Sequence, residues 1–304
     1  MFRILYFNIN FVCNNSCIFC FSHSTFFDNS YLINKNDIME LIVKYKVSSN
    51  DRIIINGGEP TLHPELLEII RLFHKTGAEI IVYTNGRKLR DADYCCKLVE
   101  MVNRIVVPVH GEESVHDNIT QKKGSFIDTI CGVKNILMLD SSKLELKFIV
   151  TENMIRSDFS INDFLFCNHY EPSSVALTGV VPTAVSQLNN VSLPSPDELG
   201  KYVSRQIDEL LFKYNGSIKL FDCELCRLTP ELREYIDKLP LEVDNHIYYN
   251  YYYYFDGKYR SGKLIRYNDN RKCENCNQTN ICRRISDACI VLELCHDAKK
   301  IVLE

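Results

Sequence analysis

Residues 11–21 read Phe11-Val-Cys-Asn-Asn-Ser-Cys-Ile-Phe-Cys-Phe21 and place Cys13, Cys17 and Cys20 at C-x3-C-x2-C spacing. Soft thiolate ligands select zinc, Cu(I) or iron–sulfur clusters. Three thiolates on one short loop can hold three irons of a cubane cluster, and no fourth cysteine lies beside them. An open metal position is typical of catalytic sites, whereas structural sites are closed. The spacing therefore predicts a cluster that binds a further ligand through its free iron.

Two other interpretations of these cysteines carry less weight. Cysteine is a small, well-buried residue and the chain has 14 of them, so chance grouping is the first. A disulfide framework is the second, but the chain is long and its N-terminus has no signal-peptide pattern. The grouped spacing favours metal binding over both.

The composition is that of a soluble globular protein, with 46% hydrophobic and 24% charged residues. A chain of 304 residues can form one large domain, or a domain with a smaller one. The net charge of −4 arises from mixed signs without a basic block, which argues against a general nucleic-acid binder. No apolar run approaches the roughly 18 residues of a membrane span. The many cysteines of a chain without a secretion signal fit a reducing cytoplasm.

Short runs rich in Ile and Val alternate with longer amphipathic runs over the first two-thirds of the chain. This alternation predicts an α/β fold with parallel βα units, in a barrel or a doubly wound sheet. In both, ligands collect at the carboxyl ends of the strands, which is where the cysteine loop follows the first strand. The predicted strands are Ile4–Asn10, Arg52–Asn56, Glu79–Thr84, Arg104–Val109, Leu144–Val150 and Ser174–Val180, and the predicted helices are Lys35–Tyr45 (capped by Asn36-Asp37), Pro64–Thr76, Asp91–Met101, Ser125–Leu139 and Ser160–Asn168.

The pattern changes after about residue 190. An amphipathic helix is predicted over Asp197–Tyr214 and another helix near Pro230–Leu239. The tyrosine-rich run His246–Phe255 is followed by Asp256-Gly257, which is a strong hairpin signal. We interpret the tyrosines as a half-buried strand, because a stacking surface for nucleic acid would carry interleaved basic residues.

These motifs together resemble a known family. The C-x3-C-x2-C motif, with Phe19 ahead of its last cysteine, resembles the signature of radical S-adenosylmethionine (radical SAM) enzymes. Gly57-Gly58-Glu59-Pro60, directly after the second predicted strand, is similar to that family's glycine-rich SAM-binding motif. Val82-Tyr-Thr-Asn-Gly86 and Val107-Pro-Val-His-Gly111 match further at the ends of the third and fourth strands. The resemblance covers about residues 3–185 and includes features of peptide-maturing members.

The resemblance implies a partial (β/α)6 TIM-like barrel over residues 1–190 and a small cysteine-rich α+β module over residues 191–304. It implies a [4Fe-4S] cluster on Cys13, Cys17 and Cys20 whose open iron is chelated by SAM. An electron donor such as flavodoxin or ferredoxin would supply one electron. SAM would then be cleaved to methionine and a 5′-deoxyadenosyl radical that abstracts hydrogen from the substrate.

The same resemblance implies how SAM is held. In the motif Gly57–Pro60, the two glycines let backbone approach the methionine part, and Glu59 accepts hydrogen bonds from the ammonium group. Phe19 packs beside adenine, Thr84 and Asn85 offer polar atoms, and Lys147 pairs with the carboxylate. A surface position is an equal alternative for Lys147. This chain departs from many relatives at His110, which stands where they carry an acidic residue.

A second group of cysteines follows in the C-terminal part. Zinc bound by two C-x2-C pairs is one interpretation. The resemblance favours an auxiliary [4Fe-4S] cluster of a SPASM or twitch module, although Gly262 stands where the module would place a cysteine. Cys223 is then left over, as an alternative ligand or as a hydrogen donor to a product radical. The predicted auxiliary ligands are Cys226, Cys273, Cys276 and Cys282.

The leading interpretation is a radical SAM enzyme that modifies a ribosomally made peptide by crosslinking, thioether formation or epimerisation. The alternative is a radical SAM dehydrogenase or biosynthetic enzyme that acts on a small molecule. A remote alternative is a non-enzymatic zinc-binding interaction protein, which leaves Gly57–Pro60 unexplained.

Overall fold

The structure is a computed structural model. It describes residues 3–20, 30–180, 189–221, 223, 227–230, 232, 241–243, 250–255, 258–266 and 290–293.

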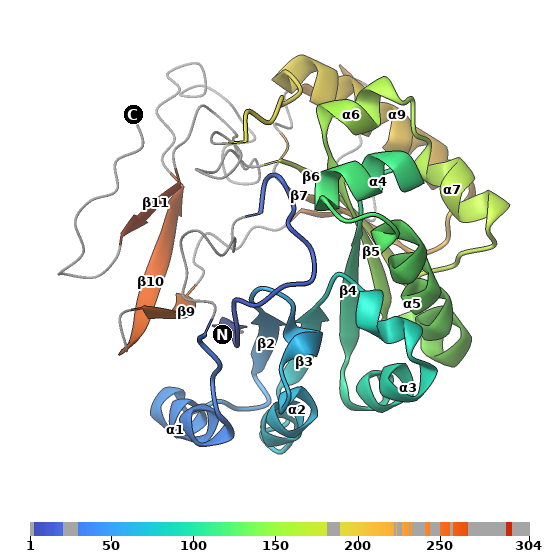
Figure 1. Ribbon diagram of the computed structural model, residues 1–304. Helices are drawn as coiled ribbons and strands as arrows, with labels where there is room; N and C mark the ends of the chain where they lie inside the picture. The colour runs from blue at the N-terminus through green and yellow to red at the C-terminus, as the bar shows by residue number, and fades with distance from the viewer. Residues whose placement is uncertain are drawn as a thin grey trace.

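The described strands form one open sheet (Figure 1). In chain order they are β1 Arg3–Asn8, β2 Asp51–Asn56, β3 Glu79–Tyr83, β4 Arg104–Val109, β5 Leu144–Val150, β6 Ser174–Gly179, β7 Ser217–Phe221, β8 Leu241–Val243, β9 Asn250–Phe255, β10 Lys258–Arg266 and β11 Ile290–Glu293. Their spatial order is β11-β10-β9-β1-β2-β3-β4-β5-β6-β7-β8. Neighbours from β1 to β8 pair in parallel, so their carboxyl ends meet at one edge of the sheet.

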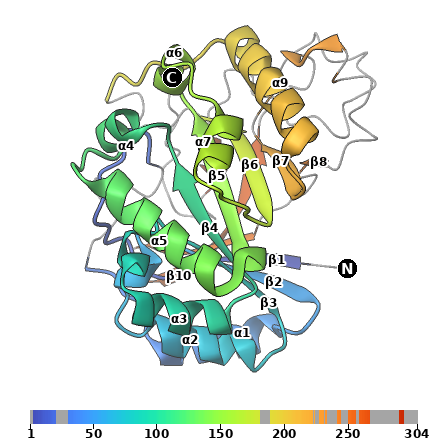
Figure 2. The same ribbon diagram turned by 90° about the vertical axis from the view of Figure 1, so that its right-hand side faces the viewer.

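Helices connect the parallel strands and cover one face of the sheet (Figures 1 and 2). Within the described residues, no helix is both long and apolar enough to span a membrane. The helices are α1 Lys35–Tyr45, α2 Leu66–His74, α3 Ala92–Met101, α4 Glu113–Thr120, α5 Ser125–Asp140, α6 Glu152–Arg156, α7 Ile161–Cys167 and α9 Pro196–Lys213, with the short 3-10 turns η1 Pro60–Leu62, η2 Arg87–Arg90 and η3 Ser141–Lys143.

The two faces of the sheet differ in character because successive side chains of a strand point to opposite sides. One face supplies residues such as Phe7 and Phe148 to a large apolar core with the helices. The other face carries a small cluster around Ile54, Ile81 and Val106, next to polar groups. The buried carboxylate of Glu145 accepts hydrogen bonds from Lys219 Nζ at 2.8 Å and Ser174 Oγ at 3.0 Å.

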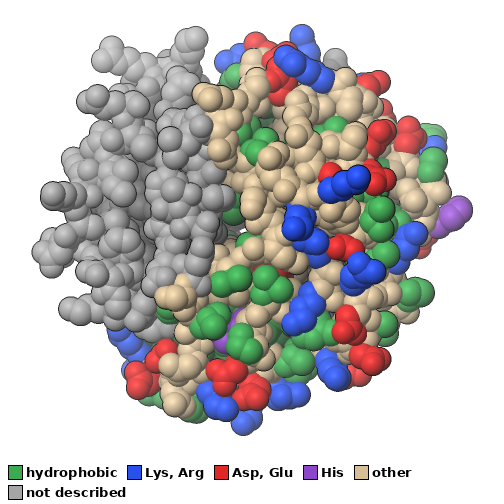
Figure 3. All heavy atoms as spheres, in the orientation of Figure 1, with side chains coloured by type: hydrophobic (Ala, Val, Ile, Leu, Met, Phe, Trp, Pro, Cys, Tyr) green, Lys and Arg blue, Asp and Glu red, His purple; other side chains and the backbone are tan. Residues whose placement is uncertain are grey.

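Acidic and basic side chains are intermixed over the described part of the surface in Figure 3. This view fits the mixed charge pattern of the sequence.

The predicted α/β class with parallel strands is confirmed. Strands β4 and β5 and helix α1 have the predicted bounds, and the other predicted strands of the first two-thirds begin and end within two residues of their predicted bounds. Helix α2 is shorter than predicted, since it begins at Leu66 and ends at His74. The prediction of six strands was incomplete, because β7 continues the parallel series next to β6.

Helix caps account for two of the observed boundaries. The side chain of Asn34 accepts hydrogen bonds from the amides of Asn36 and Asp37 in a capping box, so the prediction that Asn36-Asp37 caps this helix was wrong by two residues. Ser195 caps α9 through the amide of Glu198, and Pro196 occupies the first turn, where its missing N–H costs nothing.

The predicted hairpin is confirmed in the C-terminal part. β9 and β10 are antiparallel, and Phe255 pairs with Lys258, which leaves the predicted two-residue Asp256-Gly257 connection between them. Most of the predicted helix near Pro230–Leu239 lies outside the described residues. The predicted auxiliary ligands Cys226, Cys273, Cys276 and Cys282 also lie outside them.

Helix α5 packs closely on the turn that follows β3. A Cβ added at Gly132 would lie 2.2 Å from Gly86 O. We therefore expect Gly132→Ala to lower the free energy of unfolding by about 1–3 kcal/mol through overpacking. Urea unfolding measures this. The control is Met138→Ala on the same helix, where the side chain is 76% exposed. An equal, small effect of both variants would contradict the close packing.

Candidate functional site

The cysteine loop lies at the carboxyl edge of the parallel strands. It follows β1 and runs across the sheet toward α4 in Figure 1. The amides of Ser16 and Ile18 donate to Thr120 O at 2.9 Å and Ile119 O at 3.0 Å, at the end of α4. The amide of Cys20 closes a turn on Cys17 O at 3.1 Å. Backbone contacts thus hold the loop at the edge of the sheet where ligands bind in such folds.

The three thiols lie close enough to influence one another. Burial raises the pKa of the Cys17 thiol well above its usual range, and Cys20 and Cys13 raise it further. Burial, with Glu59 and Cys20 also contributing, raises the pKa of Cys13 to about 11, although this residue keeps exposed surface. Cys13 and Cys17 are therefore protonated at neutral pH unless a cation replaces their protons.

Thiolates are the ligands that iron–sulfur clusters use. Among the described residues, no three Cys, His, Asp or Glu side chains are arranged to hold one metal ion. A cubane cluster does not require this, because each thiolate binds a different iron. The donor set of Cys13, Cys17 and Cys20 thus suits a cluster with one iron left for another ligand.

The glycine-rich turn after β2 packs directly against the cysteine loop. The amide of Gly58 donates to Asn10 O at 2.9 Å, and the amide of Glu59 donates to Val12 O at 2.7 Å. A Cβ at Gly57 would lie 2.3 Å from Asn10 O, and one at Gly58 would lie 2.4 Å from Val12 O. Gly57 also has a φ of +143°, which disfavours other residues. The glycines are required for this contact; their approach to SAM stays a prediction.

The Glu59 side chain ties the ends of β2 and β3 together. Its carboxylate is buried and accepts hydrogen bonds from Thr61 Oγ1 and Thr84 Oγ1, both at 2.6 Å, and from the amide of Asn85 at 2.7 Å. Burial raises the pKa of Glu59 despite these donors. Pro60 is buried and starts η1 beside it. The donors found on Glu59 belong to the protein, so its predicted contact with an ammonium group remains a prediction.

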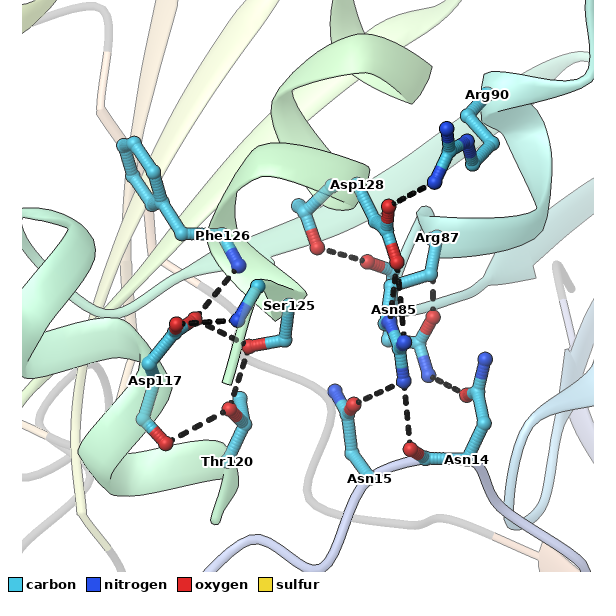
Figure 4. A network of polar contacts seen from close by, with 12 residues as sticks. Asn14, Asn15, Asn85, Arg87, Arg90, Asp117, Thr120, Ser125, Phe126 and Asp128 are labelled. Atoms are coloured by element: carbon cyan, nitrogen blue, oxygen red, sulfur yellow. Dashed lines mark hydrogen bonds and ion pairs between the residues drawn. The ribbon is translucent and has the colours of Figure 1, made fainter. Parts of the chain in front are cut away.

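The turn after β3 contacts the cysteine loop from another side (Figure 4). Asn85 Nδ2 donates to Asn14 Oδ1 at 2.6 Å and lies 3.9 Å from Cys13 Sγ. Arg87 Nη1 donates to Asn14 O at 2.6 Å and to Asn15 Oδ1 at 3.1 Å. The segment between the first two cysteines is thus held by side chains of this turn.

Asp128 of α5 holds the guanidinium of Arg87 in place (Figure 4). Its Oδ2 accepts from Arg87 Nε at 3.2 Å and Nη2 at 3.0 Å, a two-pronged contact that fixes the orientation of the fork. Asp128 Oδ1 also accepts from the more exposed Arg90 at 2.5 Å. Arg87 and Asp128 were not among the predicted site residues. The one sequence signal that pointed to this pair was the basic residue Arg87 directly after the Val82–Gly86 motif.

A row of aromatic rings extends from the cysteine loop into the protein. The ring of Phe19 meets His110 edge-on at 5.5 Å, and His110 lies 5.0 Å from His116. The amide of His110 donates to His116 Nδ1 at 3.3 Å. Burial lowers the pKa of His110 well below its usual range and that of His116 to about 4. Both imidazoles are therefore neutral at physiological pH, so His110 does not replace an acidic residue with a cation.

Lys147 lies on the sheet face opposite the helices. Its ammonium is 5.6 Å from the ring centroid of Tyr83 and 5.4 Å from that of Phe221, at the ends of β3 and β7. Its predicted contact with a carboxylate stays a prediction.

Cys223, the predicted spare thiol, is 3% exposed.

The structure thus brings most of the predicted residues to one edge of the sheet. The three cysteines, Phe19, Gly57–Pro60, Thr84 and Asn85 meet there through the contacts given above. Their convergence from the ends of β1, β2 and β3 defines the candidate site.

Part of the chain matches the sequence profile of a known protein family. Residues 7–144 match the sequence profile of the Radical SAM superfamily. This range contains the cysteine loop, the Gly57–Pro60 turn and the Asn85–Arg87 turn. The matched range is less than half of the chain, and over this range the chain is similar to radical SAM proteins, as its motifs predict.

The curated relatives match part of the chain. A probable GTP 3′,8-cyclase of Saccharolobus islandicus is 31% identical over 140 residues, which is 46% of this chain and 45% of the relative. Another, of Sulfurisphaera tokodaii, is 32% identical over 155 residues, or 50% of this chain and 48% of the relative. The matches span just under half the length of these relatives.

Solved structures with a similar fold include two proteins bound to S-adenosylmethionine. anSMEcpe with bound AdoMet and the Kp18Cys peptide has a TM-score of 0.58 at 17% identity, covering 71% of this chain and 63% of that one. Streptococcus suis SuiB bound to S-adenosylmethionine has a TM-score of 0.60 at 13% identity, covering 75% and 52%. At these identities the similarity establishes the shared fold.

The contact between the glycine turn and the cysteine loop can be tested with a matched pair of glycines. Gly57 and Gly124 both have positive φ, but a Cβ at Gly124 meets nothing within 4 Å. We expect Gly57→Ala to bind about four fewer irons than the wild type after anaerobic reconstitution, because its Cβ forces the cysteine loop away. Gly124→Ala should keep iron and lose only about 1–3 kcal/mol of stability from backbone strain. Equal iron content in both variants would contradict the account.

The raised pKa of Glu59 predicts a pH dependence of stability. A carboxyl whose pKa is higher in the folded protein stabilises it most at low pH, and this contribution falls as pH rises above its usual 4.5. Glu59→Gln removes the titrating carboxyl group and replaces one of its acceptor oxygens by an N–H2 donor. We expect this to lower the free energy of unfolding by about 1–3 kcal/mol. Urea unfolding of both proteins should show the stability advantage of Glu59 shrinking as the pH rises above 4.5. An advantage that grows with pH would refute this.

Proposed function

We propose that this protein is a radical SAM enzyme that generates a 5′-deoxyadenosyl radical and uses it to modify a peptide. The observation that carries the proposal is the convergence of Cys13, Cys17 and Cys20 with the Gly57–Glu59 turn at the carboxyl edge of the sheet. Three thiols fit three irons of a [4Fe-4S] cluster and leave one iron for SAM. A cluster bound there supplies one electron for the cleavage of SAM.

The residues of the chain hold and orient the reactants. Cys13, Cys17 and Cys20 bind the cluster as thiolates, so their protons leave when it is inserted. The Gly57–Pro60 turn offers backbone groups to the methionine part of SAM, and Phe19 packs beside adenine. Lys147, whose ammonium lies 5.6 Å and 5.4 Å from the ring centroids of Tyr83 and Phe221, pairs with the carboxylate of SAM in this proposal. One external electron, from a donor such as flavodoxin or ferredoxin, balances the cleavage of SAM to methionine and the radical.

A peptide substrate is supported by the solved structures with the same fold. anSMEcpe is seen with the Kp18Cys peptide, and SuiB with its precursor peptide SuiA. Hydrogen abstraction from such a peptide leaves a peptide radical. This radical gives a crosslink or a thioether when it also loses one proton and passes one electron to an iron–sulfur cluster, and it gives an epimerised residue when a thiol returns a hydrogen atom. We assign the protein to this group, with a ribosomally made peptide as substrate.

A small molecule is the second candidate substrate, because the curated relatives are probable GTP 3′,8-cyclases. A nucleotide would then enter the site in place of a peptide. The two candidates differ in the molecule that changes mass, so one incubation with both distinguishes them.

We further propose that residues 191–304 form a module with an auxiliary [4Fe-4S] cluster on Cys226, Cys273, Cys276 and Cys282. Cys223 then serves as a spare thiol or hydrogen donor. The supporting observation is the cysteine spacing alone. An iron content of about eight atoms per chain supports two clusters, whereas about four leaves only the first. A reducing cytoplasm suits both clusters, and the cysteines of the described residues are free thiols.

The proposed activity predicts a dependence on the first three cysteines. The protein, purified and reconstituted without oxygen, should convert SAM to 5′-deoxyadenosine and methionine when a reductant is added. Chromatography with mass spectrometry measures both products. Replacement of Cys13, Cys17 and Cys20 by Ala should reduce the products to the level without reductant. The control Cys167→Ala changes an exposed thiol on α7 and should keep full activity.

The substrate is tested in the same reaction. A candidate precursor peptide should lose two hydrogens on crosslinking, or gain one deuterium in D2O on epimerisation. GTP should remain unchanged. Conversion of GTP with an unchanged peptide would contradict the peptide assignment and favour the second candidate. A colourless protein that binds zinc, binds no iron and does not cleave SAM would refute the proposed function altogether.

A further inference from the structure

The turn after β3 makes side-chain contacts with the cysteine loop, and these contacts reach a proposed cluster ligand. We infer that Asn85 and Arg87 are positioning residues that raise the reduction potential of the cluster on Cys13, Cys17 and Cys20. Asn85 acts by donating to the Cys13 sulfur, and Arg87 by fixing a positive charge beside the loop. The inference rests on the proposed cluster and adds to it a control of how readily the cluster accepts its electron.

Two N–H groups point at the Cys13 sulfur. The backbone amide of Asn15 lies 3.4 Å from Cys13 Sγ, and Asn85 Nδ2 lies 3.9 Å from it. Reduction adds one negative charge to the cluster and its ligands. Donors to a ligand sulfur stabilise this charge, so they raise the potential. Asn85 supplies the side-chain donor, which substitution can remove without changing the backbone.

The orientation of the Asn85 amide is determined by its surroundings. Its Oδ1 accepts from the amide of Arg87 at 3.0 Å, which turns the Nδ2 group toward the loop. Its backbone N–H donates to Glu59 at 2.7 Å, and its carbonyl accepts from Thr129 Oγ1 at 2.8 Å. The donor to Cys13 is therefore held by these three contacts and reaches the sulfur without rearrangement.

The positive charge of Arg87 is directed at the loop. Its side chain is 13% exposed, so solvent screens it weakly. Asp128 holds the guanidinium from the side away from the loop, while Nη1 contacts Asn14 and Asn15 (Figure 4). Arg90 shares Asp128, so the three side chains together carry one net positive charge. A reduced cluster beside this arrangement is favoured over an oxidised one.

Arg90 provides a matched control. It binds the same carboxylate at 2.5 Å, but its side chain is 63% exposed. Among the described residues, its side chain contacts Asp128 and not the cysteine loop. Solvent screens the charge of Arg90, so its loss should leave the reduction potential of the cluster unchanged. The pair Arg87→Gln and Arg90→Gln therefore separates the effect of position from that of charge removal alone.

The experiment is a redox titration of the reconstituted holoenzyme, followed by electron paramagnetic resonance of the reduced cluster, with iron content measured for each protein. Asn85→Leu and Arg87→Gln should each lower the midpoint potential. The expected size is about a tenfold change in the oxidised-to-reduced ratio at fixed potential, or about 59 mV for one electron. Arg87→Lys, which keeps the charge, should shift less than Arg87→Gln, and Arg90→Gln should match the wild type.

The outcomes are distinguishable. Iron-loaded Asn85→Leu and Arg87→Gln with the wild-type potential would overturn the inference and leave the proposed function intact. If Arg87→Gln binds no iron, Asn85→Leu decides, because the Arg87–Asp128 pair remains in that variant. Failure of both variants to bind iron would also overturn it, since the residues would then act in cluster assembly. A wild-type protein that takes up no four-iron cluster would refute the proposed function itself.

Discussion

Backbone of the cysteine loop and backbone of the glycine-rich turn approach each other at the carboxyl edge of the sheet, closer than any side chain between them would allow. Gly58 and Glu59 donate to Asn10 and Val12 across this contact, and Asn10 Nδ2 donates back to Glu59 O at 3.0 Å. The other features of the site follow from it. The loop can present three thiols in one place because it is paired with a turn that a parallel strand holds rigidly.

Polar side chains further stabilise the cysteine loop and the strand ends that the backbone contact brings together. Glu59 links the ends of β2 and β3, and Asp128 on α5 orients Arg87 against the loop. Neither carboxylate belongs to the cysteine loop. Glu59 acts on the loop through Asn85, and Asp128 acts on it through Arg87. The site is thus an assembly of strand ends, and its geometry depends on the register of the parallel sheet and on the packing of α5.

Much of the fold and part of the site were predictable from the sequence. Short apolar runs predicted the bounds of β4 and β5. The two motifs of the site follow similar runs, which form β1 and β2. Strand β7 was missed, since it has five residues and follows a long helix instead of a motif. Arg87 and Asp128 were missed because they are 41 positions apart, and only the packing of α5 on η2 brings them together. The roles of the glycines in loop packing also required the structure, because sequence does not reveal which backbone approaches them.

The central claim is that the loop holds a four-iron cluster with one iron open to SAM. Mössbauer spectroscopy of the iron-57 reconstituted protein, before and after addition of SAM, tests it most directly. The account predicts that SAM changes the signal of one iron in the cluster bound by Cys13, Cys17 and Cys20, and that a protein lacking these cysteines shows no such change. A spectrum that SAM leaves unaltered would contradict it.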